Sequence, residues 1–142
     1  MRFTPSWKPA TIRYGSKRSA QMIRLKRVYE PATPADGIRF LVERLWPRGV
    51  KKSSLRRDAW VKEVALSASL RRRFGHDPGK WDESRRRYFA ELEKQTDTWQ
   101  SILKEAQNST FTLVYSSHDT EHNNAVALKE YLEAKMRKDA HQ

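Results

Sequence analysis

The amino-acid sequence predicts an α/β fold, a single-domain sandwich with a small, mostly parallel β-sheet flanked by helices. Three short runs have the apolar composition of strands, at residues 23–29, 38–45 and 111–115. Amphipathic helical patterns lie between the second and third runs and after the third. Strands that alternate with helices favour a parallel sheet. The 142 residues suffice for one domain with a hydrophobic core.

Residues 1–21 differ from the rest of the chain and are expected to form a flexible basic N-terminal arm. They contain five basic residues, no acidic residue and no hydrophobic periodicity. Met22 directly precedes the first strand-like run, which makes it a candidate translation start. The predicted α/β domain therefore covers residues 22–142.

The strand predictions rest on two different patterns. Apolar and basic residues alternate over 23–29, which is the period-two pattern of a strand. After a loop with proline and glycine, the run 38–45 is more continuously apolar, as is typical of a central strand. Residues 51–58 form a basic connection. The stretch 58–65 fits either a helix or an extended segment.

The first helices are predicted from their end signals. Ser67 is a suitable N-cap for a short helix that Gly75 would end. Asp77 followed by Pro78 marks the start of the next helix, because proline is favoured at the first helical position. Apolar residues then recur at helical spacing up to Leu92. We interpret these apolar stripes as core.

The second half of the chain continues the alternation. A break at residues 95–97 precedes a helix that runs to about residue 106. The strand 111–115 follows a turn, and a final helix is predicted from about Asp119 to Met136, with one apolar face.

Composition limits the possible functions. The net charge of +12 favours anionic partners, either small molecules or nucleic acid, although surface solvation alone also explains a basic chain. The absence of cysteine excludes a thiol nucleophile and disulfides. Neither a membrane span nor the apolar region of a secretory signal is present, so a cytoplasmic location is expected. The oligomeric state is not indicated.

The turn after the second strand carries the strongest indication of a binding site. Residues 43–49 have the sequence Glu-Arg-Leu-Trp-Pro-Arg-Gly. In an open α/β sheet, ligands bind beyond the carboxyl ends of the strands. Arg44 and Arg48 suit bidentate recognition of phosphate or carboxylate, and Trp46 offers a stacking face or a wall. The sequence therefore predicts a site for an anionic ligand.

A second candidate segment follows the strand 111–115. It begins at Tyr115 and includes His122 and Asn123, near the predicted start of the last helix. The backbone N–H groups and the dipole of a helix start favour an anion. If the strands are parallel, both segments lie on one rim of the sheet, and the arginines face His122 and Asn123 across one cleft.

Structural roles are alternatives for several of these residues. Asp119 or Ser117 would also serve as a simple helix cap. Arg44 would also form an ordinary ion pair with Glu43 or Glu63.

His76 has two explanations as well. It is either a general acid or base near the site or a hinge residue between the caps at Gly75 and Asp77, and the hinge is the favoured account.

Searches for cofactor motifs do not identify a cofactor. Residues 118–122 match the H-x-x-E-H pattern of a zinc peptidase class, but the short remaining chain offers few third ligands, so no metal site is predicted. The sequence contains neither a P-loop nor a dinucleotide-binding glycine motif. A nucleotide would instead be held by arginines and a helix terminus.

Four segments together resemble a known family, the small bacterial YeaO-like branch of the DUF488 proteins. In chain order, these segments are residues 26–30, 43–49, 74–78 and 121–124. The resemblance extends from Met22 to about Leu132 and implies a compact cytoplasmic α/β domain of undetermined function. The recurring motif positions of the family fall on Arg27, Arg44, Trp46, Arg48, His76, His122 and Asn123.

The leading hypothesis is a cleft that binds a small phosphate- or nucleotide-like anion, with catalysis left open. Arg27, Arg44 and Arg48 would neutralise the charge of the ligand. His122 is the candidate acid or base, and Asn123 would orient the ligand or His122. His76 and Tyr115 complete the candidate ligand-binding set. The alternative is a basic nucleic-acid-binding or regulatory protein that uses the arm and the charged surface.

Overall fold

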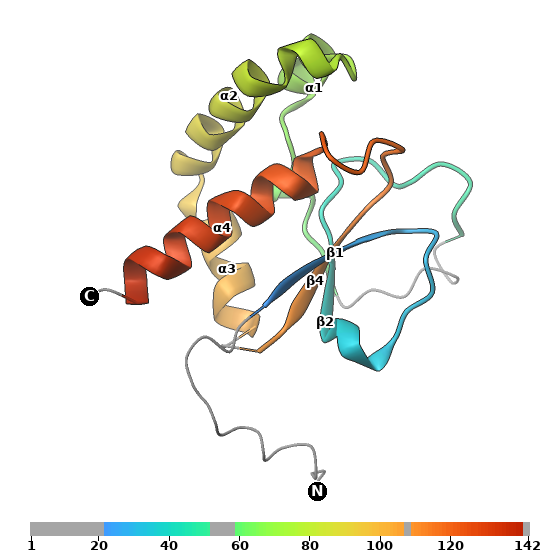
Figure 1. Ribbon diagram of the computed structural model, residues 1–142, viewed down its shortest axis with the longest axis vertical. Coiled ribbons are helices and arrows are strands. Elements are labelled where there is room, and N and C mark those ends of the chain that lie inside the picture. Colours follow the sequence, from blue (N-terminus) through green and yellow to red (C-terminus); the bar gives the residue numbers. More distant parts are fainter. Residues whose placement is uncertain (1–21, 52–58, 107–108, 141–142) are drawn as a thin grey trace, which may run out of the picture.

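A computed structural model describes residues 22–51, 59–106 and 109–140 of the chain. Its centre is a four-stranded sheet made of β1 (Ile23–Arg27), β2 (Ile38–Leu41), β3 (Ala59–Trp60) and β4 (Phe111–Tyr115). The strand order is β1-β4-β2-β3, and each neighbouring pair is parallel (Figure 1). The α/β class and the parallel sheet predicted from the sequence are thus confirmed.

The register of the sheet brings distant segments together at one edge. Arg27 at the end of β1 pairs with Tyr115 at the end of β4, and Leu41 at the end of β2 pairs with Val114. These three strands therefore end side by side. The segments that follow β2 and β4 leave the sheet next to each other, which is where an open parallel sheet places its binding sites.

Within the described residues, four α-helices and three single-turn 3-10 helices lie between or after the strands. Their order is η3 (Pro34–Asp36), η4 (Lys62–Val64), α1 (Ala68–Phe74), η5 (Pro78–Lys80), α2 (Trp81–Glu93), α3 (Thr96–Ala106) and α4 (Asn124–Ala140). Among the described residues, no helix has both the length and the apolar composition to cross a bilayer.

The helix ends predicted at Ser67, Gly75 and Asp77 are confirmed. The Ser67 side chain accepts a hydrogen bond from Leu70 N and caps α1, and Gly75 ends that helix in a left-handed conformation with φ of 55°. Asp77 caps η5, which leads directly into α2. These ends are set by local hydrogen bonding and backbone freedom, so the sequence was sufficient to locate them.

The two faces of the sheet have different coverings. One face packs against the helices in a core that includes Phe40, Tyr88, Trp99, Phe111 and Leu128, all buried. Figure 1 shows α1, α2, α3 and α4 gathered on one side of the sheet. On the opposite face, strand and loop residues form a smaller cluster, with buried Val28, Leu41 and Val114 against Trp46, Val50 and Trp60.

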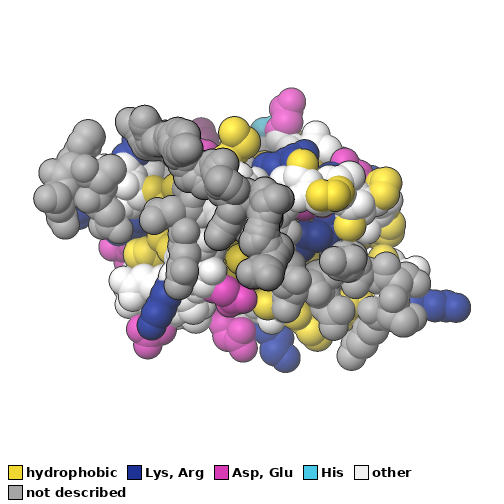
Figure 2. All heavy atoms as spheres, turned by 90° about the horizontal axis from the view of Figure 1, so that it is seen from below, with side chains coloured by type: hydrophobic (Ala, Val, Ile, Leu, Met, Phe, Trp, Pro, Cys, Tyr) yellow, Lys and Arg dark blue, Asp and Glu magenta, His cyan; other side chains and the backbone are white. Residues whose placement is uncertain are grey.

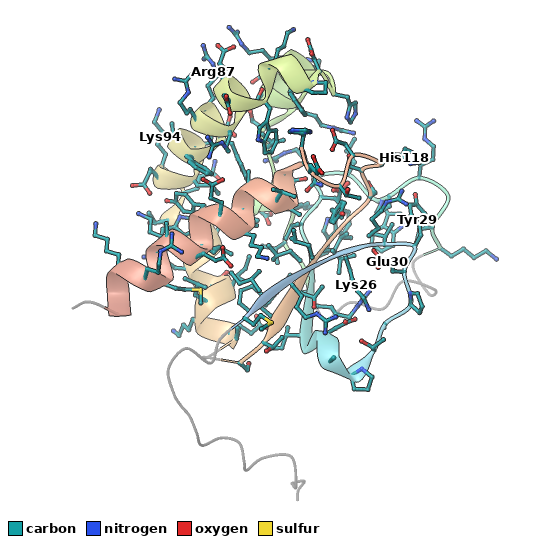
Figure 3. The ribbon with its side chains drawn as sticks, in the orientation of Figure 1. Lys26, Tyr29, Glu30, Arg87, Lys94 and His118 are labelled. Carbon is teal, nitrogen blue, oxygen red and sulfur yellow. The ribbon has the colours of Figure 1, made fainter. Side chains whose placement is uncertain are left out.

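A buried ion cluster lies on this second face of the sheet. Asp36 is fully buried and forms ion pairs with Lys26, Arg39 and Arg24. Lys26 is labelled on β1 in Figure 3. Burial alone would raise the pKa of the Asp36 carboxyl, but hydrogen bonds from Lys26, Thr33 and Arg39 outweigh it and hold that pKa far below its usual range.

Two predicted boundaries need correction. The strand predicted at 38–45 ends at Leu41, because residues 42–49 form an irregular turn. The last helix begins at Asn124 and not near Asp119. Residues 120–123 form bends and not helix, since the Asp119 carboxylate accepts hydrogen bonds from the backbone N–H groups of Glu121 and His122.

Two other expectations are resolved differently. The ambiguous stretch 58–65 contains both alternatives in turn, the short strand β3 and then η4. The arm predicted for residues 1–21 lies outside the described residues, as does the basic connection predicted at 51–58 except for Lys51.

Candidate functional site

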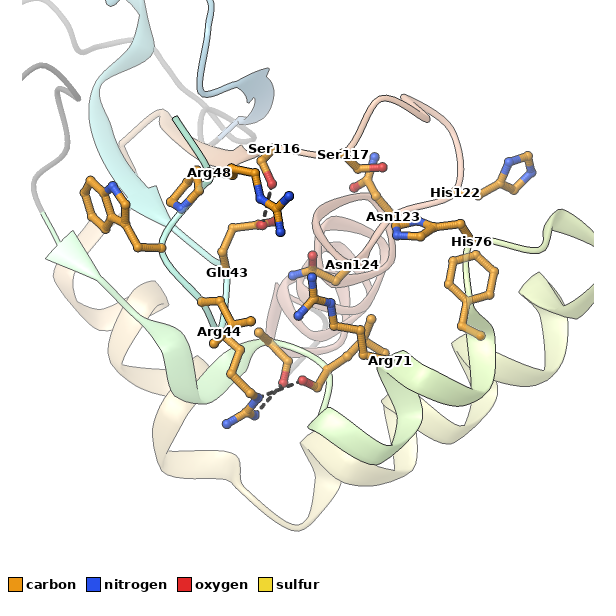
Figure 4. Close-up of a pocket in the computed structure, with 16 residues that line it drawn as sticks. Glu43, Arg44, Arg48, Arg71, His76, Ser116, Ser117, His122, Asn123 and Asn124 are labelled. Atoms are coloured by element: carbon orange, nitrogen blue, oxygen red, sulfur yellow. Dashed lines mark hydrogen bonds between the residues drawn. The ribbon is translucent and has the colours of Figure 1, made fainter. Parts of the chain in front are cut away.

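A pocket of about 240 Å³ lies at the carboxyl edge of the sheet (Figure 4). Its lining comes from four parts of the chain, which are residues 43–48, five positions between 65 and 76 (Ala65, Leu66, Arg71, Phe74 and His76), residues 116–117 and residues 122–124. The turn after β2 and the segment after β4 both contribute, because their strands end side by side in the parallel sheet. The structure therefore brings Arg44, Trp46, Arg48, His122 and Asn123 to one pocket.

A hydrogen bond between Glu43 and Ser116 joins the ends of β2 and β4 at this pocket. The Ser116 hydroxyl donates to Glu43 Oε1 at 2.7 Å, which Figure 4 shows as a dashed line. The Trp60 indole Nε1 also donates to the backbone carbonyl of Glu43 at 2.6 Å. The carboxylate is thus fixed at the pocket wall.

Arg44 links the turn after β2 to the segment before α1. Its Nε donates to the Leu66 carbonyl at 2.9 Å, and its Nη2 donates to the Ala65 carbonyl at 3.0 Å. The fork shape of the guanidinium suits such a double contact. Arg44 therefore holds the pocket wall, in place of the ion pairs with Glu43 or Glu63 that the sequence allowed. Its contact with a ligand stays a prediction.

Arg48 and Arg71 are the two exposed arginines of the lining. They come from the turn after β2 and from α1, respectively. Within the described parts of the chain, neither guanidinium has a hydrogen bond or an ion pair. Their donors are therefore available to a molecule in the pocket.

Trp46 is held as part of the wall. Its Nε1 donates to the Val50 carbonyl at 2.5 Å, and its ring contacts Trp60 edge to face at 5.3 Å between centroids. Half-buried Trp46 packs against the small cluster on the second face of the sheet.

His122 forms a pair with Asp119. The ring Nδ1 lies 3.0 Å from Asp119 Oδ2, and the ring contacts Trp81 edge to face. The hydrogen bond from Glu121 N is the main cause that lowers the pKa of the Asp119 carboxyl. Hydrogen bonds from His122 lower this pKa further, whereas burial opposes both effects. Because an ionised carboxylate only accepts hydrogen bonds, Nδ1 donates and a neutral ring keeps Nε2 as an acceptor.

His76 lies in the turn between α1 and η5, as the hinge account predicts, and it also lines the pocket. Its φ of 61° is in the left-handed region, which costs a non-glycine residue on the order of 1 kcal/mol or more. Its ring is 6.3 Å from that of Phe74. The strained backbone places an exposed imidazole at the rim of the pocket.

Asn123 and Asn124 have structural contacts. Asn123 is buried, and its Oδ1 accepts from Val126 N, so Asn123 is the cap of α4 in place of Asp119 or Ser117. Its Nδ2 donates to the Asp119 carbonyl at 2.8 Å. Asn124 Nδ2 donates to the Val42 carbonyl at 2.6 Å, which ties α4 to the end of β2.

Two predicted ligand-binding residues, Arg27 and Tyr115, do not line this pocket. Arg27 donates to the carbonyls of Ser117 and Ser116, at 2.9 and 3.3 Å, and so supports the loop after β4. Its Nη2 also lies 3.4 Å from Nδ1 of His118. Tyr115 is buried on the helix side of the sheet, and this burial raises the pKa of its phenol.

The H-x-x-E-H segment does not form a helical pair of histidines. Because α4 begins at Asn124, both His118 and His122 lie in the preceding loop. His118 contacts Arg27, whereas His122 contacts Asp119. The helical spacing on which the zinc pattern depends is therefore missing.

The lining also contains polar residues that the sequence did not single out as site residues, among them Glu43, Arg71 and Asn124. The sequence indicated Glu43 only as part of the motif 43–49 and as a possible ion-pair partner of Arg44, since an acid does not suggest an anion site. Arg71 belongs to a run of three arginines on α1, and only the packing of that helix decides which one meets the pocket.

Comparison with known proteins identifies relatives but no activity. A family model described as the inactive DUF488-N3 subclade matches residues 22–142. An uncharacterised protein of Escherichia coli (strain K12), YeaO, is 40% identical over 110 residues, covering 78% of this chain and 96% of the relative.

Uncharacterised proteins of Mycobacterium bovis and Mycobacterium tuberculosis are 46% identical over 70 residues. This match covers 49% of the chain and 59% of each relative. No solved structure matches the chain.

Proposed function

The chain belongs to the DUF488 family, in its inactive DUF488-N3 subclade, and from this premise we propose that its pocket binds a small anionic ligand with a phosphate- or nucleotide-like group. The observation that carries the proposal is the meeting of Arg48 and Arg71 at one pocket. They come from segments far apart in the sequence, and no described residue forms an ion pair with them. Arginines placed in this way suit recognition of phosphate or carboxylate.

The start of α4 adds to the positive character of the pocket. Asn123 and Asn124, at the N-terminal end of this 17-residue helix, belong to the lining. The N-terminus of a helix carries partial positive charge and stabilises anions nearby. The histidines His76 and His122 supply further hydrogen-bonding groups at the rim.

Binding without turnover is favoured over catalysis. The matching subclade is described as inactive, and the amide of Asn123 is engaged in capping α4. The pair of His122 and Asp119 is the arrangement that would serve acid–base chemistry, and His122 stays the candidate residue for it.

Ligand-induced stabilisation tests the proposal. Thermal unfolding is recorded with inorganic phosphate, ethyl phosphate and AMP, because a ligand that binds only the folded state raises the midpoint progressively as its concentration exceeds the dissociation constant. The double variant Arg48→Ala/Arg71→Ala should lose the shift. Arg72→Ala is the matched control, since Arg72 is exposed on the same helix and does not line the pocket.

The expected result is a concentration-dependent rise in midpoint for the native protein and for Arg72→Ala, and none for the double variant. If none of these anions moves the midpoint of the native protein, or if both variants lose the shift equally, the proposed pocket is not an anion site.

A second candidate function is binding of nucleic acid. The observation in its favour is the exposed run Arg71, Arg72 and Arg73 on α1, together with the net charge of +12. Two facts place it second. Arg73 is already paired with Glu83, and on the face in Figure 2 acidic and basic side chains are interspersed among the coloured residues.

A further inference from the structure

We propose that the ligand of this pocket carries a protonated amine as well as an anionic group, and that the Glu43 carboxylate binds the amine. This inference rests on the proposed function, because it names the chemical class of the anion that the pocket accepts. The pocket contains side chains of both charges. A pocket that offers Arg48 and Arg71 to an anion also places a carboxylate in its wall.

The position of Glu43 is defined by two contacts from different strands. Ser116, directly after β4, donates its hydroxyl to Oε1. Trp60, in β3, donates its indole N–H to the Glu43 carbonyl. The loop that carries Ser116 is itself supported by Arg27. An acidic group held in this way keeps its place when a ligand enters, which is the condition for selective binding.

The Glu43 carboxylate keeps one oxygen, Oε2, without a hydrogen-bond partner among the described residues. No ion pair joins Glu43 to an arginine or lysine within those parts of the chain. The adjacent Arg44 directs its Nε and Nη2 to the carbonyls of Leu66 and Ala65. An acceptor therefore remains at the pocket wall.

A simple phosphate and a phosphorylated amine should bind this pocket with different affinities. Phosphate near Arg48 and Arg71 is repelled by Glu43, and that repulsion lowers its affinity. A ligand with an ammonium group can place it at Oε2 while its phosphate meets the arginines. Hydrogen bonds between charged partners are the stronger kind, and an unpaired carboxylate selects against ligands that lack the donor.

The competing explanation is that Glu43 only joins β2 to β4 through Ser116. Both explanations account for the hydrogen bond between Glu43 and Ser116. They predict different relative affinities for two ligands that are alike except that one carries an ammonium group. Ethyl phosphate and O-phosphoethanolamine are such a pair. A purely structural Glu43 gives no reason for the second to bind better.

The experiment measures the affinity of both compounds by calorimetry at neutral pH, for the native protein and two variants. Glu43→Gln removes the charge and keeps an oxygen that can accept from Ser116. Glu105→Gln is the matched control, because Glu105 is exposed on α3, does not line the pocket and changes the net charge equally. Circular dichroism checks that both variants are folded.

The native protein should bind O-phosphoethanolamine about tenfold more tightly than ethyl phosphate, as expected for one charge-assisted hydrogen bond. Glu105→Gln should keep this preference and Glu43→Gln should lose it. Equal binding of the two compounds by the native protein overturns the inference and leaves the anion site standing. A preference that persists in Glu43→Gln also overturns it. If neither compound binds, the proposed function fails as well.

Discussion

His122 and Asp119 contact each other twice, through the ring and through the backbone. Nδ1 of His122 is 3.0 Å from one carboxylate oxygen of Asp119, and the backbone N–H of His122 donates to the other at 2.9 Å. The same carboxylate therefore shapes the loop before α4 and orients the imidazole. This relationship makes Asp119 a positioning residue for His122.

Asp119→Ala should destabilise the protein by about 1 kcal/mol, within the range measured for lost capping interactions. The reason is that the N–H groups of Glu121 and His122 lose their acceptor. Urea denaturation measures the change. Asp119→Asn keeps one acceptor oxygen and should lose less stability. An alanine variant as stable as the native protein would contradict the capping role.

Arg44→Ala should destabilise the fold by roughly 2–3 kcal/mol, because two hydrogen bonds from a charged donor are lost and their carbonyl acceptors are left without it. Chemical denaturation measures this loss, and anion binding is followed in parallel. Arg44→Lys should not restore the stability, since an ammonium cannot span the carbonyls of Ala65 and Leu66 as a planar fork does. A stable Arg44→Ala that only loses anion binding would show that Arg44 is a ligand contact instead.

Asp36→Asn should cost about 3–5 kcal/mol, the range for breaking a buried ion pair. The substitution leaves Lys26 and Arg39, both buried, without their carboxylate partner. Denaturation at neutral pH measures the cost. Asp97→Asn is a suitable control, because Asp97 is an exposed acid in the first turn of α3.

The same carboxylate should govern acid stability. The pKa of Asp36 in the fold is lower than its ordinary value of 3.8. Its contribution is therefore complete above about pH 4 and declines as the pH falls below that value. The free energy of unfolding of the native protein should fall over this range, whereas that of Asp36→Asn should change less. Parallel pH profiles for the two proteins would refute this assignment.

Gly37 and Gly49 form a matched pair for a test of packing. Both have positive φ, 65° and 78°. A Cβ at Gly37 would lie 2.1 Å from the Thr110 carbonyl oxygen, whereas at Gly49 no described atom would be within 4 Å. Gly49→Ala should cost about 1–2 kcal/mol from backbone strain alone. Gly37→Ala should lose clearly more stability, which thermal unfolding measures. Equal losses for the two variants would contradict a role for the close approach to Thr110.

Nucleic-acid binding, the second candidate function, has a simple signature. Affinity for single-stranded or duplex DNA should fall steeply as salt rises, in proportion to the phosphates contacted. Removing residues 1–21 takes away five basic residues and should flatten this dependence. Fluorescence anisotropy at several salt concentrations measures both effects. Weak binding that is insensitive to salt would exclude this function.

Local signals explain why so much of the fold was predictable. Ser67, Gly75 and Asp77 end or begin helices through contacts with residues close in sequence, and each prediction is confirmed. The apolar run at 38–41 was correctly expected at the centre of the sheet, because burial on both faces requires it. The start of α4 was misplaced, since both Asp119 and Asn123 can cap a helix.

By itself, the sequence determined the α/β class, the parallel sheet and the two segments that meet at its carboxyl edge. The strand order brings these two segments together in one pocket, because it places the ends of β2 and β4 next to each other. Only the tertiary structure showed that Arg44 binds backbone carbonyls, that Arg27 lies behind the wall, and that Glu43 and Arg71 belong to the pocket. A side chain's partner depends on segments distant in sequence, and local patterns do not carry that information.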